Sequence, residues 1–108
     1  MNQIITSGHI TNDIATKATK AGEKYVVFNM AWNKGKGENA KTIFYQVSVF
    51  GNMADFVEKY FKKGSAVEVV GELDITLNEK NGKTYLNSKI MANYVGFYGF
   101  SATKEPAD

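Results

Sequence analysis

Residues 42–64 read TIFYQVSVFGNMADFVEKYFKKG, and the spacing of the apolar side chains changes within this stretch. Up to Phe50 the pattern has the two-residue period of a strand. From Met53 onward apolar residues recur at three and four positions, which predicts a helix with Asn52 as its N-cap and Gly64 beyond its end. The stretch therefore predicts a strand that leads directly into a helix.

The predicted strand over residues 42–50 has two different faces. One face is mostly aliphatic and is expected to point into a core; it carries Ile43, Tyr45, Val47 and Val49. The other face carries Phe44, Gln46, Ser48 and Phe50. Two aromatic rings with polar side chains between them suit a surface that stacks flat ligands. The alternative is that Phe44 and Phe50 meet a partner subunit.

Four further strands are predicted on either side of this stretch. They cover Ile4–Ile10, Tyr25–Trp32, Ala66–Leu77 and Lys83–Met91. Asn81-Gly82 predicts a type I′ hairpin between the last two, while Gly8 and Gly71 lie inside strands and mark bends. The polar segments 13–22 and 34–41 are expected to be loops. Three strands, one helix and two strands predict an all-β fold, a five-stranded oligonucleotide/oligosaccharide-binding (OB) barrel with the helix between strands three and four.

Length and composition limit the class of protein. A chain of 108 residues has room for one domain, predicted over residues 1–100, with a short polar tail over residues 101–108. We find no apolar run long enough for a membrane span and no secretory signal pattern, which favours a cytoplasmic protein that makes no membrane contact. With no cysteine and one histidine, we expect no metal site, no cofactor and no thiol chemistry.

Charge and aromatic content together indicate a nucleic-acid partner. All 13 basic residues are lysines, and the net charge is +2. Arginine makes the best bidentate contacts to guanine, so its absence argues against a reader of specific duplex sequences, whereas lysine suits diffuse attraction to phosphates. The chain also has one Trp, six Tyr and seven Phe, more rings than a small core hides.

Motifs along nearly the whole chain carry a more specific resemblance. They are Asn2, Gly8, Asp13, Phe28-Asn29-Met30-Ala31, Phe44, Val49-Phe50-Gly51, Ala54, Tyr60-Phe61-Lys62-Lys63-Gly64-Ser65, Val67-Glu68-Val69-Val70-Gly71-Glu72-Leu73, Asn81-Gly82 and Tyr85. In this order and at these spacings they resemble the bacterial or phage-encoded single-stranded DNA-binding protein family. The resemblance implies a homotetramer that coats single-stranded DNA without sequence preference during replication, recombination or repair, with a nucleoid-associated location.

The resemblance also implies which residues bind DNA. Phe44 and Phe50 match aromatic positions that stack bases, and Lys63 matches a basic position on the DNA path. Loops that contact DNA in the family correspond here to the segment with Lys34 and Lys36 and to the hairpin tip with Lys80 and Lys83. The candidate nucleic-acid-binding residues are Trp32, Lys34, Lys36, Phe44, Gln46, Phe50, Lys63, Lys80 and Lys83.

The chain departs from the family at several positions. Lys36 and Asn78 lie near places where the family has tryptophans, and Ile14 replaces a proline. Trp32 stands where the family has a small or β-branched residue, and both core packing and base stacking remain open for it. The segment Lys104–Asp108 does not resemble the acidic tip by which the family recruits enzymes, so tail-dependent replication and repair enzymes are not expected partners.

Two other classes of function remain as alternatives. A replication-restart accessory protein would use Phe44 and Phe50 in protein contacts rather than DNA contacts. A nuclease would need clustered carboxylates for metal ions, and the nearest set is Glu68, Glu72 and Asp74 on one strand face without a histidine beside it. We therefore expect a binding protein with no catalytic residue rather than an enzyme.

Overall fold

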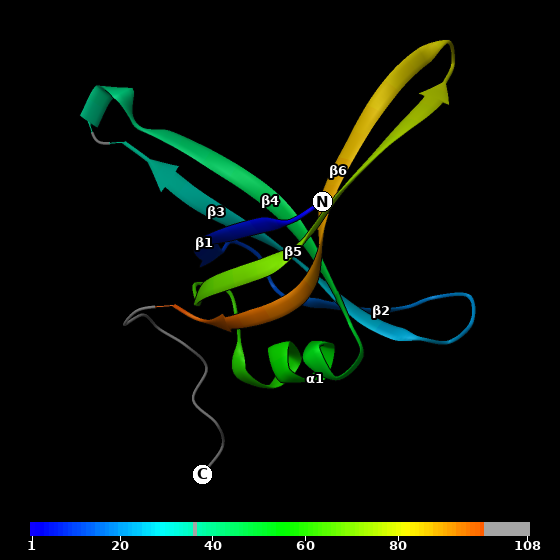
Figure 1. Ribbon diagram of the computed structural model, residues 1–108, viewed down its shortest axis with the longest axis horizontal. Helices are drawn as coiled ribbons and strands as arrows, with labels where there is room; N and C mark the ends of the chain where they lie inside the picture. Colours follow the sequence, from blue (N-terminus) through cyan, green and yellow to red (C-terminus); the bar gives the residue numbers. More distant parts are fainter. Residues whose placement is uncertain (36, 99–108) are drawn as a thin grey trace.

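The computed structural model describes residues 1–35 and 37–98. Its elements are β1 (Ile4–Ile10), β2 (Ala15–Ala18), β3 (Lys24–Lys34), a short 3-10 turn (Gly37–Asn39), β4 (Lys41–Phe50), α1 (Gly51–Tyr60), β5 (Ala66–Lys80) and β6 (Lys83–Phe97). Lys36, Phe100 and the predicted tail over residues 101–108 lie outside the described residues. The predicted strand-to-helix transition is confirmed, since β4 passes into α1 at Phe50 and Gly51 (Figure 1).

Five strands close into a ring. The sheet order is β1-β5-β6-β4-β3-β2, and β1 also pairs with β3 at His9↔Ala31 and Ile10↔Met30. The pairing of β4 with β6 is parallel, and all the others are antiparallel. The ring contains the five predicted strands, with α1 between the third and the fourth of them, so the predicted fold class is confirmed.

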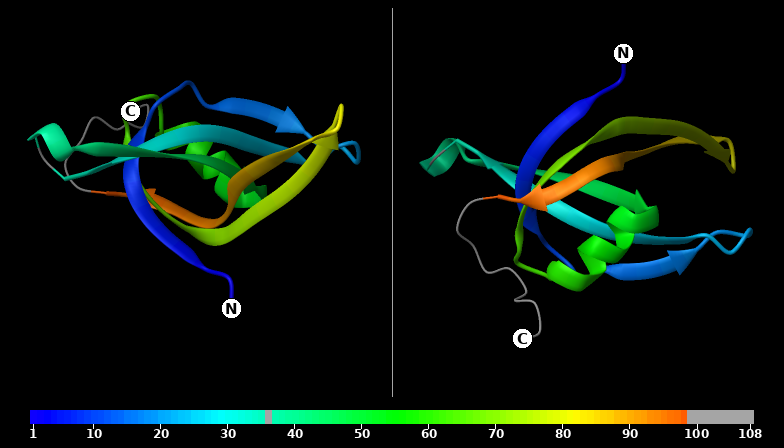
Figure 2. Two further views of the ribbon diagram at one scale, coloured as in Figure 1. Left: turned by 90° about the horizontal axis from the view of Figure 1, so that it is seen from above. Right: turned by 60° about the horizontal axis from the view of Figure 1, so that its bottom comes forward.

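The core lies inside this ring, and α1 lies across its lower end (Figure 2). Alternate residues of each strand point inward, as Val26, Phe28 and Met30 do on β3 with no solvent exposure. Ala54 and Val57 of α1 and Phe61 after it complete the same cluster. The helix is amphipathic because its apolar residues recur at three and four positions, and this face closes the barrel.

Several elements differ in extent from the sequence-based expectations; for example, the strand expected to end at Leu77 continues to Lys80. The helix begins at Gly51 and has no side-chain cap, so the expected N-cap at Asn52 is wrong. Gly51 has a φ of +69°, and the chain turns at this residue directly from strand into helix, leaving no linker for a capping residue. The strand expected to end at Met91 continues to Phe97. The short strand β2 lies in a segment expected to be a loop, and it pairs only with β3 on the outside of the ring.

Two glycines permit the tight crossings that the ring needs. A Cβ on Gly8 would lie 2.2 Å from the carbonyl oxygen of Ala31, where β1 crosses β3. A Cβ on Gly71 would lie 2.3 Å from the carbonyl oxygen of Met91, beside the register shift between Val70 and Gly71. Backbone atoms cannot yield at such distances, so only glycine fits at these positions.

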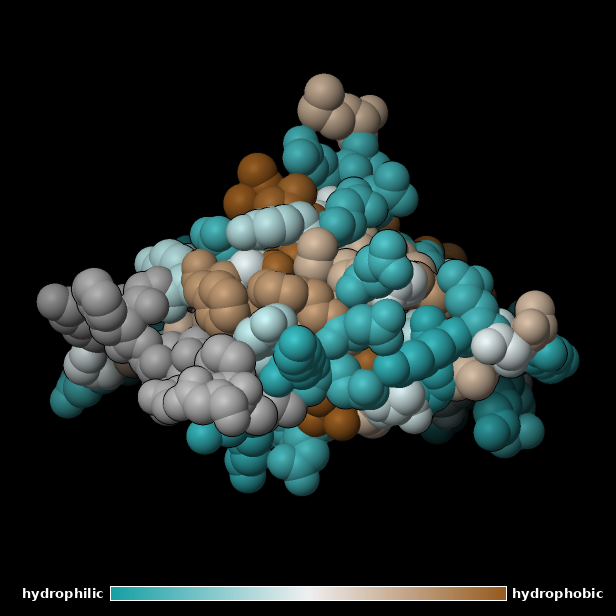
Figure 3. Space-filling model, turned by 90° about the horizontal axis from the view of Figure 1, so that it is seen from below, coloured by the Kyte–Doolittle hydropathy of each residue, from teal (hydrophilic) through white to brown (hydrophobic). Residues whose placement is uncertain are grey.

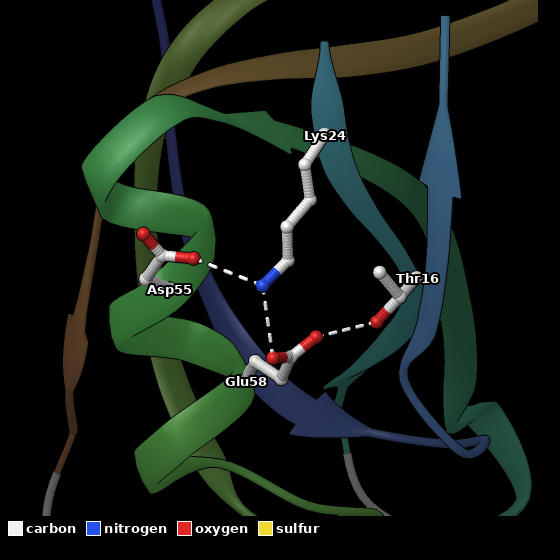
Figure 4. Close-up of polar contacts among 4 residues, drawn as sticks. All are labelled: Thr16, Lys24, Asp55 and Glu58. Atoms are coloured by element: carbon white, nitrogen blue, oxygen red, sulfur yellow. Dashed lines mark hydrogen bonds and ion pairs between the residues drawn. The ribbon is translucent and has the colours of Figure 1, made fainter. Parts of the chain in front are cut away.

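An ion-pair cluster joins the β2–β3 hairpin to α1 (Figure 4). The Nζ atom of Lys24 lies 2.9 Å from Oδ1 of Asp55 and 3.0 Å from Oε1 of Glu58, and Thr16 of β2 donates a hydrogen bond to Glu58. Hydrogen bonds to Asp55 and then to Glu58 raise the pKa of Lys24 above its ordinary value of 10.5. The cluster holds the β2–β3 hairpin against α1. Apart from this contact, β2 is held by its pairing with β3.

Two hairpin arms project beyond the ring and diverge from each other (Figure 1). One arm is formed by the end of β3 and the start of β4, and the other by the end of β5 and the start of β6. The face seen from below, around α1, is largely covered by polar side chains with apolar patches between them (Figure 3). The space between the arms is on the opposite end of the molecule from this helix.

Candidate nucleic-acid interface

A groove lies between the two arms. Pairing between β4 and β6 covers only three positions, from Val47↔Ile90 to Val49↔Ala92, so the two strands separate beyond it. One hollow of about 290 Å³ brings Gln46 of β4 against the hairpin; its other lining residues are Asp74, Thr76, Asn87, Ser88 and Lys89. A second of about 550 Å³ adjoins it at Gln46 and Ser88 and extends to Phe44 and Asn29. The groove is thus continuous from one arm to the other.

The β4 side of the groove carries two of the predicted site residues. Phe44 is 68% exposed, and Gln46 is exposed on the same face two residues further along. Asn29 of β3 pairs with Gln46, and its backbone N–H donates a 2.8 Å hydrogen bond to the side chain of Asn12. Ser48, expected on the same open face, is only 4% exposed because β6 pairs beside it at Met91. The open ring face of Phe44 and the amide of Gln46 can stack on and hydrogen-bond to a base.

Phe50 is not a free-standing ring. It stacks on Tyr25, the residue directly opposite on β3, with ring centroids 4.7 Å apart and planes inclined by 17°. One side of Phe50 is therefore covered, and any base must stack on the other side or on the outer side of Tyr25. Lys17 of β2 pairs with Tyr25 and lies on the same face. Tyr25 was not among the predicted site residues, although its alternation with buried Val26 places it on the face of Phe50.

The β5–β6 arm has a polar face and an apolar face. Residues on the polar face pair across the two strands as Asp74↔Lys89, Thr76↔Asn87, Asn78↔Tyr85 and Lys80↔Lys83. The apolar face carries Leu73, Ile75, Leu77 and Leu86. Because Asp74, Thr76, Asn87 and Lys89 line the groove, the polar face is the one that continues the Phe44 surface.

The tip of this arm matches its prediction from the Asn81-Gly82 dipeptide. Asn81 has a φ of 53° and Gly82 a φ of 77°, the left-handed backbone that a type I′ turn requires. The turn places Lys80 and Lys83 opposite each other, and an open hollow of about 510 Å³ beside them is lined by Asn78, Lys80, Asn81, Tyr85 and Asn87. Tyr85 is 49% exposed and offers a ring on an arm without tryptophan.

Lys89 is a groove residue that sequence reasoning missed. It is half-buried in the groove beside Gln46, and among the described residues it makes no ion pair, even with Asp74 opposite. Every second residue from Lys83 along β6 lies on one face, and these residues are Tyr85, Asn87 and Lys89. The two-residue period could therefore have predicted that Lys89 shares a face with Lys83. A groove lysine without a described counter-ion is a suitable contact for a phosphate.

The structure does not bring all predicted site residues together. Trp32 pairs with Ile43, and Lys34 pairs with Lys41, which puts both on the face opposite Phe44. Lys63 is exposed in the turn after α1, held by the Gly64 N–H bond to Ile10, and lies away from the groove. Lys36 is outside the described residues. The groove thus brings together Phe44 and Gln46, while Lys80 lines the hollow at the tip of the β5–β6 arm with Lys83 opposite it. Phe50 lines none of these hollows.

Neither metal ligation nor a membrane helix is found in the described part of the chain. Residues 1–35 and 37–98 contain no group of three or more His, Asp or Glu side chains arranged to hold a metal ion. In the same ranges no helix has the length and apolar character needed to cross a bilayer. The site consists of aromatic rings, amides and lysines.

A five-stranded ring with one helix and a groove of rings, amides and lysines defines an OB-fold binding module. The model of the family described as "Single-strand binding protein family" matches residues 1–98, and the chain belongs to this family. The chain is 28% identical over 102 residues to the single-stranded DNA-binding protein of Fusobacterium nucleatum, with 90% of this chain and 66% of that protein covered. It is 30% identical over 100 residues to the single-stranded DNA-binding protein of Aquifex aeolicus, with 88% and 68% covered.

A solved structure agrees in fold. The Plasmodium falciparum SSB in complex with single-stranded DNA superposes with a TM-score of 0.77 at 23% identity, covering 95% of this chain and 92% of that one. The resemblance predicted from the sequence is therefore confirmed. The chain spans 66% of the length of the Fusobacterium protein, and the matches do not favour the accessory-protein alternative.

Proposed function

We propose that this chain binds single-stranded DNA without sequence preference and protects it during replication, recombination or repair. The observation that carries the proposal is the groove between the arms, which is lined by the ring of Phe44 and by Lys89. The hollow at the tip of the β5–β6 arm adds the ring of Tyr85 and Lys80, with Lys83 directly opposite Lys80. Every base has a flat face and every nucleotide a phosphate, so this combination is tolerant of sequence. Binding needs no chemical step, and we propose that the protein is not an enzyme.

Gln46 and Asn29 fit between the ring contacts. Amide side chains both donate and accept hydrogen bonds, so they can contact any of the four bases at the edge that stacking leaves open. The exposed ring of Phe44 lies next to them on the same face. Phe50 with Tyr25 extends the face toward α1, where a strand would leave the groove.

Family membership supports two further parts of the proposal. The curated relatives carry the name single-stranded DNA-binding protein and come from bacteria, which supports a cytoplasmic, nucleoid-associated location. We also propose that the chain works as a homotetramer. The edge of β1 supports self-association, because Ile4–Gly8 pairs on one side with β5 and has no strand on its other side among the described residues.

The test is a titration of fluorescein-labelled mixed-sequence single strands and of the matching duplex at several salt concentrations. We expect tighter binding to the single strand and a log K that falls linearly with log salt by about 0.7 per phosphate neutralised. Replacing both Lys80 and Lys83 by alanine should make this slope shallower by about 1.4, two phosphates' worth. Lys20→Ala is the matched control, since Lys20 is an exposed lysine at the β2–β3 turn, outside the groove.

Two results would contradict the proposal. Equal affinity for single strand and duplex at moderate salt would contradict the claim that bases stack on the aromatic rings. Cleavage of the labelled strand in the presence of Mg²⁺ would overturn the statement that the protein only binds.

A further inference from the structure

Trp32 lies on the other face of the β3–β4 arm from the groove. It pairs with Ile43, while its neighbour Ala31 pairs with Phe44, and side chains alternate between faces along a strand. Its side chain is 38% exposed and separates two hollows, of about 170 Å³ and about 280 Å³. A core residue would be enclosed, so core packing does not account for this tryptophan.

The smaller hollow is bounded by rings from three separate parts of the chain. His9 comes from β1, Trp32 from β3 and Tyr98 from the residue after β6, and Tyr98 is 51% exposed. Neither Trp32 nor Tyr98 stacks on another ring among residues 1–35 and 37–98. Two exposed rings that border one hollow without touching leave room for a flat group between them.

The walls of this hollow are fixed by the fold. Gly8 lies against the carbonyl of Ala31 at the point where β1 crosses β3, and the next residue on each strand, His9 and Trp32, lines the hollow. Further out on β3, Asn33 accepts a 2.9 Å hydrogen bond from the hydroxyl of Thr42 and holds the register of the arm. His9 and Trp32 are therefore carried by paired strands, and Tyr98 directly follows β6.

A pair of lysines lies on the same face as Trp32, two residues further along. Lys34 and Lys41 are directly opposite each other on β3 and β4, and like charges in this position destabilise a sheet. In the described ranges neither lysine makes an ion pair with a carboxylate. Two residues of strand span about 7 Å, so Lys34 and Lys41 lie within reach of the phosphates of a nucleotide whose base contacts Trp32. A bound phosphate would relieve the repulsion.

We propose that Trp32, Tyr98 and His9 form a second binding site for a base of single-stranded nucleic acid, with Lys34 and Lys41 holding the adjoining phosphates. This site rests on the proposed function and extends it, because a strand in the groove continues around the β3–β4 arm onto the opposite face. Each arm face then holds a different part of the same strand. The occupied length is greater than the groove alone provides.

The chain contains one tryptophan, so its intrinsic fluorescence reports on this site alone. Titration with oligo(dT) long enough to leave the groove should quench Trp32, because a stacked base quenches an indole. In Phe44→Leu the affinity should fall while the quenching at saturation stays the same. In Tyr98→Leu and in the Lys34→Ala, Lys41→Ala double variant the quenching should be reduced. Photocrosslinking with oligonucleotides that carry 5-iodouracil should label Trp32 and Tyr98.

Affinity for long and short strands separates the two sites. Trp32→Leu should weaken binding of the long oligonucleotide by roughly 5- to 150-fold, the range for loss of one stacked base. It should leave unchanged the affinity for an oligonucleotide short enough to fill only the groove. Trp32 is partly exposed, so the variant should melt near the parent temperature.

Three results would overturn the second site, and they differ in what they say about the groove. If single strands bind while Trp32 fluorescence is unchanged and crosslinks map only to groove residues, the second site is wrong and the proposed function stands. If no single strand binds at all, the proposed function itself fails. If Trp32→Leu lowers the sedimentation mass and no crosslink reaches Trp32, the tryptophan belongs to an interface between chains.

Discussion

At the scale of single residues, pairing across the sheet decides what each aromatic side chain can do. Phe44 pairs with the small Ala31 and keeps an open ring, whereas Phe50 pairs with Tyr25 and is covered on one side. The sequence predicts the same role for both phenylalanines, because they lie on the same face of one strand. Their difference comes from the neighbouring strand, which no local pattern contains.

Tyr25 is expected to position Phe50. Phe50→Leu removes one ring of the stacked pair, and Tyr25→Leu removes the other, so each should weaken binding of single strands by about 1–3 kcal/mol. Because the rings act together, the double variant should cost little more than either single variant, which a double-mutant cycle by fluorescence anisotropy would measure. Additive losses would show that the two rings stack on separate bases.

Gly8 should tolerate no side chain. A Cβ at this position would meet the Ala31 carbonyl oxygen at 2.2 Å, so Gly8→Ala must push β1 away from β3 and open the ring. We expect a loss of unfolding free energy of roughly 1–3 kcal/mol, the usual range for overpacking, measured by urea denaturation. Gln3→Ala, an exposed change just before β1, serves as the control and should leave the midpoint where it is. A parent-like midpoint for Gly8→Ala would contradict the close crossing.

At the scale of elements, the strands that carry a two-residue alternation are predictable and the others are not. All four residues of β2 (Ala15–Ala18) are exposed, so the sequence shows no alternation of buried and exposed residues that would predict this strand. The strand forms because it pairs with the edge of β3. The alternation of β4 predicts which side Phe44 faces. It cannot predict that β4 and β6 separate beyond Val47, and this separation creates the groove that includes Lys89 and excludes Lys63.

The link between the β2–β3 hairpin and α1 should depend on pH in one direction. The folded-state pKa of Lys24 is raised above 10.5 by its hydrogen bonds to Asp55 and Glu58, so the charged form is favoured in the folded chain. The stabilisation is complete at neutral pH and is lost as the pH rises through the raised pKa. We expect Lys24→Met to lower Tm slightly at neutral pH and the difference from the parent to shrink above pH 10.5. Lys20→Met, at the same hairpin, should show no such convergence in thermal scans; a Tm difference for Lys24→Met that grows with pH would contradict the ion pair.

At the scale of the whole molecule, the β5–β6 arm has a polar face that lines the groove and an apolar face that is exposed to solvent among the described residues. Leu77 is 68% exposed, Leu86 64% and Ile75 51%, all on the side of the β5–β6 arm that points away from the groove. Contiguous exposed aliphatic side chains on a small protein mark an interaction surface, and we expect this one to be covered by a second copy of the chain. Polar and apolar faces on one hairpin allow DNA binding and self-association to take place at the same time.

Self-association through this arm can be tested without disturbing the groove. Leu77→Lys and Leu86→Lys place charges on the apolar face, where burial against a second copy would desolvate them, so the pair of changes should lower the mass measured by sedimentation. The parent is expected at four times the chain mass of 11.9 kDa, as a tetramer with two-fold axes. Thr76→Lys, on the groove face of the same arm, is the matched control and should keep the parent mass. A parent that sediments as a single species at 11.9 kDa would contradict the tetramer, because the apolar face and the open edge of β1 would then both remain in water.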